Sequence, residues 1–113
     1  NNENSLIGSE IINGELNYII NSITKTKNGT NKESRKLWVG TESFIIHKVE
    51  FYSKSGRLLR TIECKNIDIY SGISFIKNIY VKDLKTKTDF FIDLFDIKIG
   101  PIFKKDYFIP SSQ

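Results

Sequence analysis

The chain has 113 residues, 39% of them hydrophobic and 27% charged, which is the size of one domain with a modest core. It lacks Ala and Met and is rich in Ile and aromatic residues, which disfavours a long-helix or coiled-coil protein and favours strands. A single Cys and a single His exclude an intrachain disulfide, a Cys-based zinc site and a His-rich metal centre, so we expect no cofactor and no metal. No apolar run approaches the ~20 residues of a transmembrane helix.

The net charge is +4 and the isoelectric point is about 9.2. A basic surface of this kind can meet anionic lipid, nucleic acid or an acidic partner. AT-rich codons, however, also give many Lys, Asn and Ile residues, and Lys then serves to keep the surface soluble. We favour this second interpretation, because most of the Lys residues alternate with acidic or apolar ones.

The first half of the chain predicts four strands, at residues 6–12, 16–24, 36–39 and 45–52. Asn13-Gly14 separates the first two strands and is a strong hairpin signal, because both positions of a type I′ turn need a positive φ. Residues 25–35 are polar and basic, which predicts a mobile loop or the tip of an extended hairpin. Strand 45–52 has the clearest alternation, with Ile45, His47, Val49 and Phe51 expected on one face.

The second half predicts three further strands, at residues 58–68, 75–82 and 88–99, separated by turns at 53–56, 70–72 and 83–87. Residues 104–108 could form one helical turn. The apolar alternation changes phase after Cys64 and again after Leu94, which predicts a β-bulge at each place. Strands every 10–15 residues with short turns indicate an all-β antiparallel meander of about seven strands, not βαβ units.

The candidate catalytic residues are isolated. His47 has no partner nearby in the sequence, and nothing beside Cys64 would activate its thiol, so we expect both to be structural. Asp89, Asp93 and Asp96 are loosely spaced and are interpreted as solvent-facing or turn residues. No phosphate loop, Ser elbow or zinc spacing is present, and we expect the protein not to be an enzyme.

The basic segment from Lys25 to Lys36 could bind an anionic lipid surface or an acidic partner, although a solvated loop is the simpler interpretation. Nucleic-acid binding would need exposed aromatics among the basic residues, and the aromatics here lie in apolar contexts, so no nucleic acid is expected. Seven strands without a covering helix leave one apolar sheet face open, and this face must close on itself, be covered, or bind an apolar ligand.

Three short motifs resemble a known family: Lys36-Leu-Trp-Val, then Lys48-Val-Glu-Phe-Tyr, then Ser55-Gly-Arg-Leu-Leu-Arg-Thr. Their order is similar to the second half of the outer-membrane lipoprotein-sorting proteins, the LolA/LolB-like superfamily. The segments 67–75, 82–86, 96–99 and 106–108 continue the resemblance over nearly the whole chain. Gly40, where the family usually has Asp, and Ile76, near its usual Pro, depart from the pattern.

The resemblance implies a strongly curved, half-open antiparallel β-barrel whose apolar interior holds acyl chains and is covered by helices. It also implies that residues 1–113 form a single domain that is the C-terminal half of a longer carrier-like domain. The chain begins at Asn1, which fits such a fragment or a protein whose signal peptide has been removed. Neither the covering helices nor their functional residues can be assigned within this chain.

The function expected from this resemblance is a periplasmic or cell-envelope carrier of lipid or lipoprotein acyl chains that takes part in outer-membrane lipoprotein sorting. Its partners would be the acyl chains and envelope donor and acceptor proteins, and the isolated chain could form a homodimer. The alternative is a β-sheet protein-interaction module of the envelope without lipid cargo. The residues expected to line the acyl-chain site are Ile45, Val49, Phe51, Leu58, Ile62, Phe75, Ile79, Val81, Phe90 and Ile92.

Overall fold

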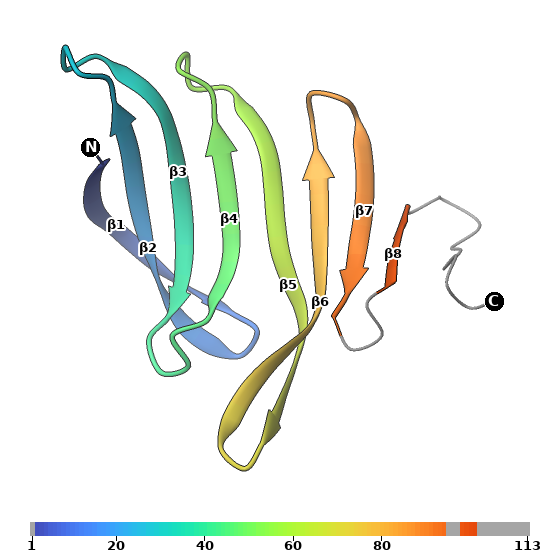
Figure 1. Ribbon diagram of the computed structural model, residues 1–113. Coiled ribbons are helices and arrows are strands. Elements are labelled where there is room, and N and C mark those ends of the chain that lie inside the picture. Colours follow the sequence, from blue (N-terminus) through green and yellow to red (C-terminus); the bar gives the residue numbers. More distant parts are fainter. Residues whose placement is uncertain (1, 95–97, 102–113) are drawn as a thin grey trace.

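The computed structural model describes residues 2–94 and 98–101, which form one antiparallel sheet of eight strands in sequence order (Figure 1). The strands are β1 (Asn2–Ile12), β2 (Glu15–Lys25), β3 (Asn31–Gly40), β4 (Ile46–Tyr52), β5 (Leu58–Tyr70), β6 (Ile73–Asp83), β7 (Thr88–Asp93) and β8 (Lys98–Pro101). No helix occurs in this part of the chain, and so none that could cross a bilayer. The predicted all-β antiparallel meander is therefore confirmed.

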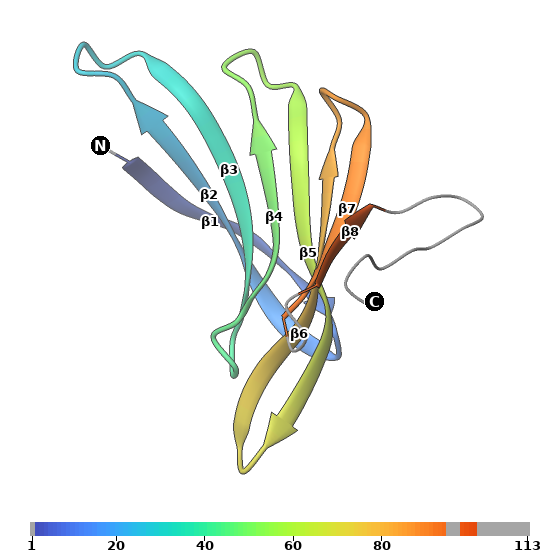
Figure 2. The same ribbon diagram turned by 45° about the vertical axis from the view of Figure 1, so that its right-hand side comes forward.

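The sheet is strongly twisted and is not closed into a barrel. Each described strand pairs only with its neighbours in the sequence, so β1 and β8 are the two edges of the described sheet. Turning the molecule by 45° shows the long hairpins splayed along the twist (Figure 2). The sheet is a single layer, and every large side chain therefore lies on one of two faces.

Two turns behave as their residue types predict. Asn13 and Gly14 have φ values of 55° and 76°, which confirms the tight hairpin between β1 and β2. Ser71 and Gly72 have φ values of 52° and 78° and join β5 to β6 in the same way. These two turns lie at the same end of the sheet as the β3–β4 turn (Figure 1), because turns alternate between the ends of a meander.

The strand boundaries differ from the prediction at two places. Residues 25–35 form the tip of an extended hairpin, one of the two predicted alternatives, but β3 begins at Asn31 and not at residue 36, because β2 and β3 pair up to a turn at residues 26–30. The predicted strand 88–99 is two strands, β7 and β8, which pair with each other through Asp93 and Lys98. The change of phase after Leu94 therefore reflects a chain reversal and not a bulge, and the sheet has eight strands where about seven were expected. The helical turn predicted at 104–108 lies outside the described residues.

The bulge predicted after Cys64 is confirmed. The register between β5 and β6 shifts once between Cys64 and Asn66 and again between Asn66 and Ile67. Beyond these shifts the β5–β6 hairpin extends away from the rest of the sheet (Figure 1). Phe75 lies on this extension, opposite Asp68.

The buried core is small because one sheet has no second layer in the described chain. Its buried apolar side chains are Trp38, Cys64, Val81 and Phe91. On the face that carries Trp38, lysine side chains lie over aromatic rings: Lys48 is 4.8 Å from the ring centroid of Trp38, and Lys65 is 5.7 Å from that of Tyr80. This face is therefore covered by the stems of charged residues and not by a further element.

Candidate ligand-binding surface

The opposite face carries a continuous apolar row that crosses seven strands. Directly paired residues of neighbouring strands lie on the same face, so the register defines the row. In order from β1 to β7 it consists of Leu6, Ile20, Leu37, Val49, Ile62, Val81 and Phe90. We call this set the central row. Every strand from β1 to β7 contributes one apolar side chain to it.

A second apolar row lies next to the central row, one pleat nearer the end of the sheet that holds the β3–β4 turn. It consists of Tyr18, Val39, Ile46, Cys64, Ile79 and Ile92. Its two halves meet where the Cys64 thiol donates a hydrogen bond to the carbonyl oxygen of Ile46 at 3.2 Å. Together the central row and this second row form what we call the apolar face.

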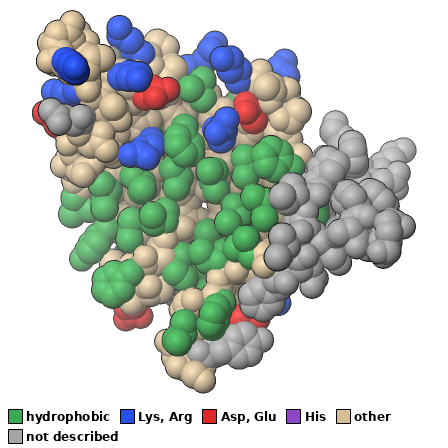
Figure 3. All heavy atoms as spheres, viewed as in Figure 1, with side chains coloured by type: hydrophobic (Ala, Val, Ile, Leu, Met, Phe, Trp, Pro, Cys, Tyr) green, Lys and Arg blue, Asp and Glu red, His purple; other side chains and the backbone are tan. Residues whose placement is uncertain are grey.

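The apolar face is partly open. Leu6 in the central row is 63% exposed, and Tyr18 and Ile46 in the second row are 48% and 44% exposed. Figure 3 shows hydrophobic side chains gathered over the middle of the sheet, with Lys and Arg at the end where the β2–β3 and β4–β5 turns lie. An apolar patch of this extent is typical of a site that binds lipid or another protein surface.

Six of the ten residues predicted to line a ligand site lie in these two rows: Val49, Ile62, Val81, Phe90, Ile79 and Ile92. Phe51 lies in the next row on the same face, directly between Arg35 and Arg60. That row is polar, since Arg60 also contacts Asp83 at 3.4 Å. The apolar face therefore has a charged margin on one side.

The structure separates the other three predicted residues from the two rows. Leu58 pairs with Tyr52, beyond a register shift between β4 and β5. Ile45 lies before the start of β4. Phe75 is 40% exposed on the β5–β6 extension, beyond both register shifts. Phe75 and Ile79 were grouped because they are an even number of residues apart in one strand. The register shifts between them interrupt the alternation on which that grouping depended.

Sequence reasoning missed the part of the apolar face that β1, β2 and β3 supply. The missed residues include Leu6, Tyr18, Ile20, Leu37 and Val39. A signal for them was present, because Tyr18 and Ile20 alternate with polar or opposite-facing residues, as do Leu37 and Val39. Joining these pairs to Val49 and Ile62 required the strand register, which the sequence does not provide.

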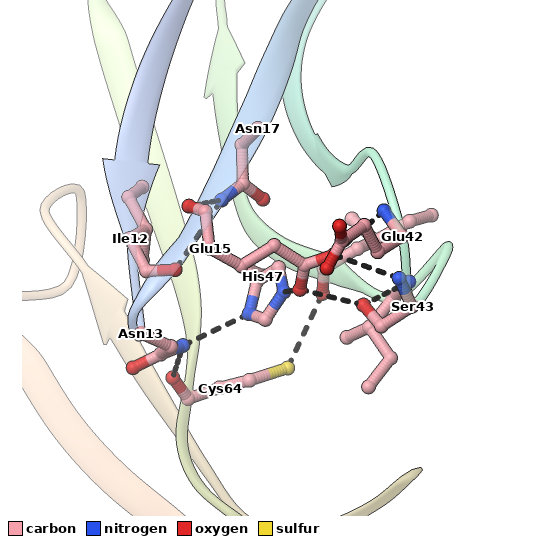
Figure 4. Close-up of polar contacts among 10 residues, drawn as sticks. Ile12, Asn13, Glu15, Asn17, Glu42, Ser43, His47 and Cys64 are labelled. Carbon is pink, nitrogen blue, oxygen red and sulfur yellow. Dashed lines mark hydrogen bonds and ion pairs between the residues drawn. The ribbon is translucent and has the colours of Figure 1, made fainter. Parts of the chain in front are cut away.

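A polar cluster holds the β1–β2 turn against β4 and the β3–β4 turn (Figure 4). His47 is 2% exposed. Its Nε2 lies 3.0 Å from Glu15 Oε1, and its Nδ1 lies 2.9 Å from Nδ2, the side-chain amide nitrogen of Asn13. Asn13 also donates to the carbonyl oxygen of Cys64 at 3.1 Å. Both ring nitrogens are satisfied if His47 is neutral with its proton on Nε2, an assignment that follows from the partners.

His47 was expected to lie with Val49 on an apolar strand face. The register between β3 and β4 shifts between the pairs Trp38–Lys48 and Val39–Ile46, so His47 is the extra residue of a bulge at the start of β4. The imidazole meets Glu15 and Asn13 instead of joining an apolar row. Because both ring nitrogens form contacts, His47 links the β1–β2 turn to the start of β4.

Glu15 is held as a carboxylate. Partial burial acts to raise the pKa of Glu15, but hydrogen bonds from the backbone and side chain of Ser43, the backbone of Glu42 and the ring of His47 outweigh burial and lower it to about 2. The shortest of these bonds joins Ser43 N to Glu15 Oε2 at 2.7 Å. Gly40 permits this approach, because a Cβ at that position would lie 2.6 Å from Glu15 Oε2.

A hollow of about 650 Å³ lies beside this polar cluster. Glu15, Ser43 and His47 line one side, and Ile67 and Ile73 of the β5–β6 extension line another. The hydrogen bonds already described use the polar groups of Glu15 and His47. The lining of the hollow also includes Glu42 and Ser74, so it would present both polar and apolar groups to a ligand.

The other candidates for chemistry are in structural settings. Cys64 is 7% exposed, and burial raises the pKa of its thiol, so the expected packed cysteine is confirmed. Asp89 is exposed, Asp93 ends β7, and Asp96 lies outside the described residues. Within residues 2–94 and 98–101 no group of three or more His, Cys, Asp or Glu side chains could hold a metal ion.

A family model described as "Uncharacterized protein" matches residues 1–112. No curated protein matches the sequence. The chain is similar in structure to a putative outer membrane lipoprotein-sorting protein domain from Vibrio parahaemolyticus, with a TM-score of 0.64 and 18% identity over 99% of this chain and 43% of the other.

Two further solved structures are similar. A LolA superfamily protein from Nitrosomonas europaea has a TM-score of 0.56 and 31% identity over 74% of this chain and 37% of the other. A DUF1329 family protein from Desulfovibrio piger has a TM-score of 0.61 and 20% identity over 80% of this chain and 37% of the other. The chain thus spans less than half the length of each, and the resemblance to the LolA-like superfamily that the sequence indicated is confirmed in the fold.

Proposed function

Since the chain belongs to the family whose model matches residues 1–112 and has a LolA-like fold, we propose that it binds the acyl chains of a lipid or lipoprotein non-covalently on its apolar face. The observation that carries this proposal is the central row, in which seven consecutive strands each place an apolar side chain on one face. No bond is made or broken in such a carrier.

The physical basis is the transfer of hydrocarbon out of water. Each buried CH₂ group contributes about 0.8 kcal/mol, so an acyl chain that lies along a few strands gains several kcal/mol. The same contact removes water from exposed side chains such as Leu6 and Tyr18. A ligand without hydrocarbon would gain little from this face, which has no polar group in its central row.

We also propose where the protein acts and in which process. The protein would work in the periplasm or cell envelope, take part in outer-membrane lipoprotein sorting, and exchange cargo with donor and acceptor proteins. We treat residues 1–113 as the C-terminal half of a longer carrier-like domain, in keeping with the sequence resemblance and with the 43% of the Vibrio parahaemolyticus domain that the chain spans. Helices or strands from the remaining half would then cover the apolar face.

A fluorescent fatty acid tests the proposal. Leu37→Glu places a carboxylate in the middle of the central row, where an unpaired charge is costly next to hydrocarbon, so binding should fall at least tenfold. Tyr18→Glu changes a half-exposed side chain and should lower affinity without affecting folding. The matched control is Phe44→Glu, because Phe44 is 79% exposed in the β3–β4 turn, outside both rows.

The variants give a clear outcome. The proposal requires weak binding by Leu37→Glu and Tyr18→Glu and parent-like binding by Phe44→Glu, with circular dichroism confirming that all three are folded. Parent-like binding by every variant, or no binding by the parent chain, would contradict it.

A protein-interaction module is the second candidate, and the exposed strand β1 supports it. All residues of β1 up to Ile11 are exposed, and β1 forms an edge of the described sheet. Such an edge can pair with a strand of a partner or of a second copy of the chain. Ile7→Lys, at the bulge of β1, should then abolish self-association in sedimentation experiments at tens of micromolar while leaving fatty-acid binding intact.

A further inference from the structure

Unpaired positive charge gathers at one end of the sheet. The β2–β3, β4–β5 and β6–β7 turns lie together there (Figure 1). Residues 26–33, 53–57 and 83–87 carry the cations Lys27, Lys32, Lys54, Arg57, Lys85 and Lys87 against two acids, Glu33 and Asp83, and Asp83 pairs with Arg60. We call these three segments the cationic end, and Figure 3 shows Lys and Arg side chains gathered there.

The six cations share two properties. All six are exposed, and none forms an ion pair with a described residue. By contrast, Lys48, Lys65 and Lys77 pair with acidic side chains within the sheet, at 3.5, 2.9 and 3.4 Å. The charge at the cationic end is therefore not balanced locally and is available to an external anion.

At the opposite end of the sheet, the three fully described turns, at residues 13–14, 41–45 and 71–72, contain no Lys or Arg. That end exposes apolar side chains instead, including Phe44 at 79% and Ile69 at 70%. A codon bias that scattered Lys over the surface would supply both ends alike, so composition does not account for the segregation.

We propose that the cationic end docks on an anionic lipid membrane surface. Three turns that project from one sheet end can meet a flat surface together, and each contributes two cations. Leu84, 39% exposed beside Lys85, adds an apolar side chain at the same level. Arg35 and Arg60, on the charged margin of the apolar face, lie between this end and the central row, so a docked molecule would hold the apolar face next to the bilayer.

The strength of such docking follows from general electrostatics. Each Lys or Arg near an anionic leaflet contributes about 1 kcal/mol, roughly a fivefold change in affinity, and the attraction weakens within a Debye length as salt increases. Replacing two of the six cations should therefore weaken binding about 25-fold. A flat acidic protein surface is the alternative partner, and the experiment separates it from lipid.

The experiment is co-sedimentation of the full chain with vesicles of phosphatidylcholine alone or mixed with phosphatidylglycerol. The test variant is Lys54→Gln with Lys85→Gln, which removes one cation from each of two turns. The matched control is Lys65→Gln with Lys77→Gln, which removes the same net charge from lysines that lie within ion pairs of β5 and β6. Polyglutamate serves as the acidic-polypeptide competitor.

We expect the parent to bind only the anionic vesicles, more weakly as salt is raised, and the test variant to bind about 25-fold more weakly while the control stays within about threefold of the parent. Polyglutamate at a matched charge concentration should not displace the protein. An equal loss in both variants, binding to phosphatidylcholine alone, or binding to polyglutamate but not to anionic vesicles would overturn the proposal. None of these outcomes depends on whether the apolar face binds a fatty acid.

Discussion

The imidazole Nε2 of His47 lies 3.0 Å from Oε1 of Glu15, although 32 positions separate the two residues in the sequence. This contact joins the β1–β2 turn to the start of β4, in addition to the pairing of β2 with β3 along the sheet (Figure 4). The central row begins on those two strands. The contact therefore stabilises the part of the sheet that supplies the β1 and β2 residues of the central row, although Glu15 and His47 do not belong to that row.

Replacing the Glu15 carboxylate should destabilise the fold. Glu15→Gln retains one carbonyl acceptor for the four groups that now donate to two carboxylate oxygens, and we expect a loss of about 2–3 kcal/mol in the free energy of unfolding. Urea unfolding measures it. Glu42→Gln is the control, since the side chain of Glu42 is exposed and only its backbone bonds to Glu15. Equal stability of the two variants would show that the cluster contributes little.

The same carboxylate predicts an acid dependence. The pKa of Glu15 is about 2 in the folded chain against an ordinary value of 4.5, so its contribution is present above pH 4.5 and is lost as the pH falls from there toward 2. The difference in urea midpoint between the parent and Glu15→Gln should be constant from pH 7 to about 5.5 and should shrink below 4.5. A difference that stays constant down to pH 3 would contradict this account.

Gly40 should not tolerate a methyl group. Gly40→Ala would place its Cβ 2.6 Å from both Glu15 Oε2 and Ser43 Oγ, so the cluster must shift, at a cost of about 1–3 kcal/mol. Gly8→Ala is a matched change in β1, where the nearest atom to the new Cβ would be Ile19 Cδ1 at 3.8 Å. Thermal unfolding should show a lower midpoint for Gly40→Ala and little change for Gly8→Ala, and the reverse order would refute the close approach.

The Cys64 thiol should react slowly. Its side chain is 7% exposed and burial raises its pKa, so little thiolate is present or accessible at neutral pH. A chromogenic disulfide reagent should label the native chain at least a hundredfold more slowly than the chain in urea. Comparable rates would mean that the sheet opens readily between β4 and β5.

Local signals predicted much of the fold. Asn13-Gly14 located the first hairpin, the alternation from residue 45 to 52 located β4, and the phase change after Cys64 located a bulge. Apolar doublets such as Ile19-Ile20 are different, because either member could face the apolar side. Their phase is set by pairing with β3, a long-range property.

The site was predictable only in part for the same reason. Val49, Ile62 and Val81 could be grouped from alternation within single strands, and the register places them in one row. The Glu15–His47 contact had no local pattern, because it depends on where two turns meet. The cationic end, by contrast, was within reach of sequence reasoning, since alternate turns of any meander lie at the same end.

The most direct test of the central claim is photo-crosslinking with a fatty acid that carries a diazirine in its acyl chain. After irradiation and proteolysis, mass spectrometry would identify the labelled residues. The account predicts labels on the apolar face, in particular at Ile20, Leu37, Val49 and Ile62, and none at Lys36, Lys48 or Thr61 on the other face. Labels confined to the β5–β6 extension, or spread equally over both faces, would contradict acyl-chain binding by the central row.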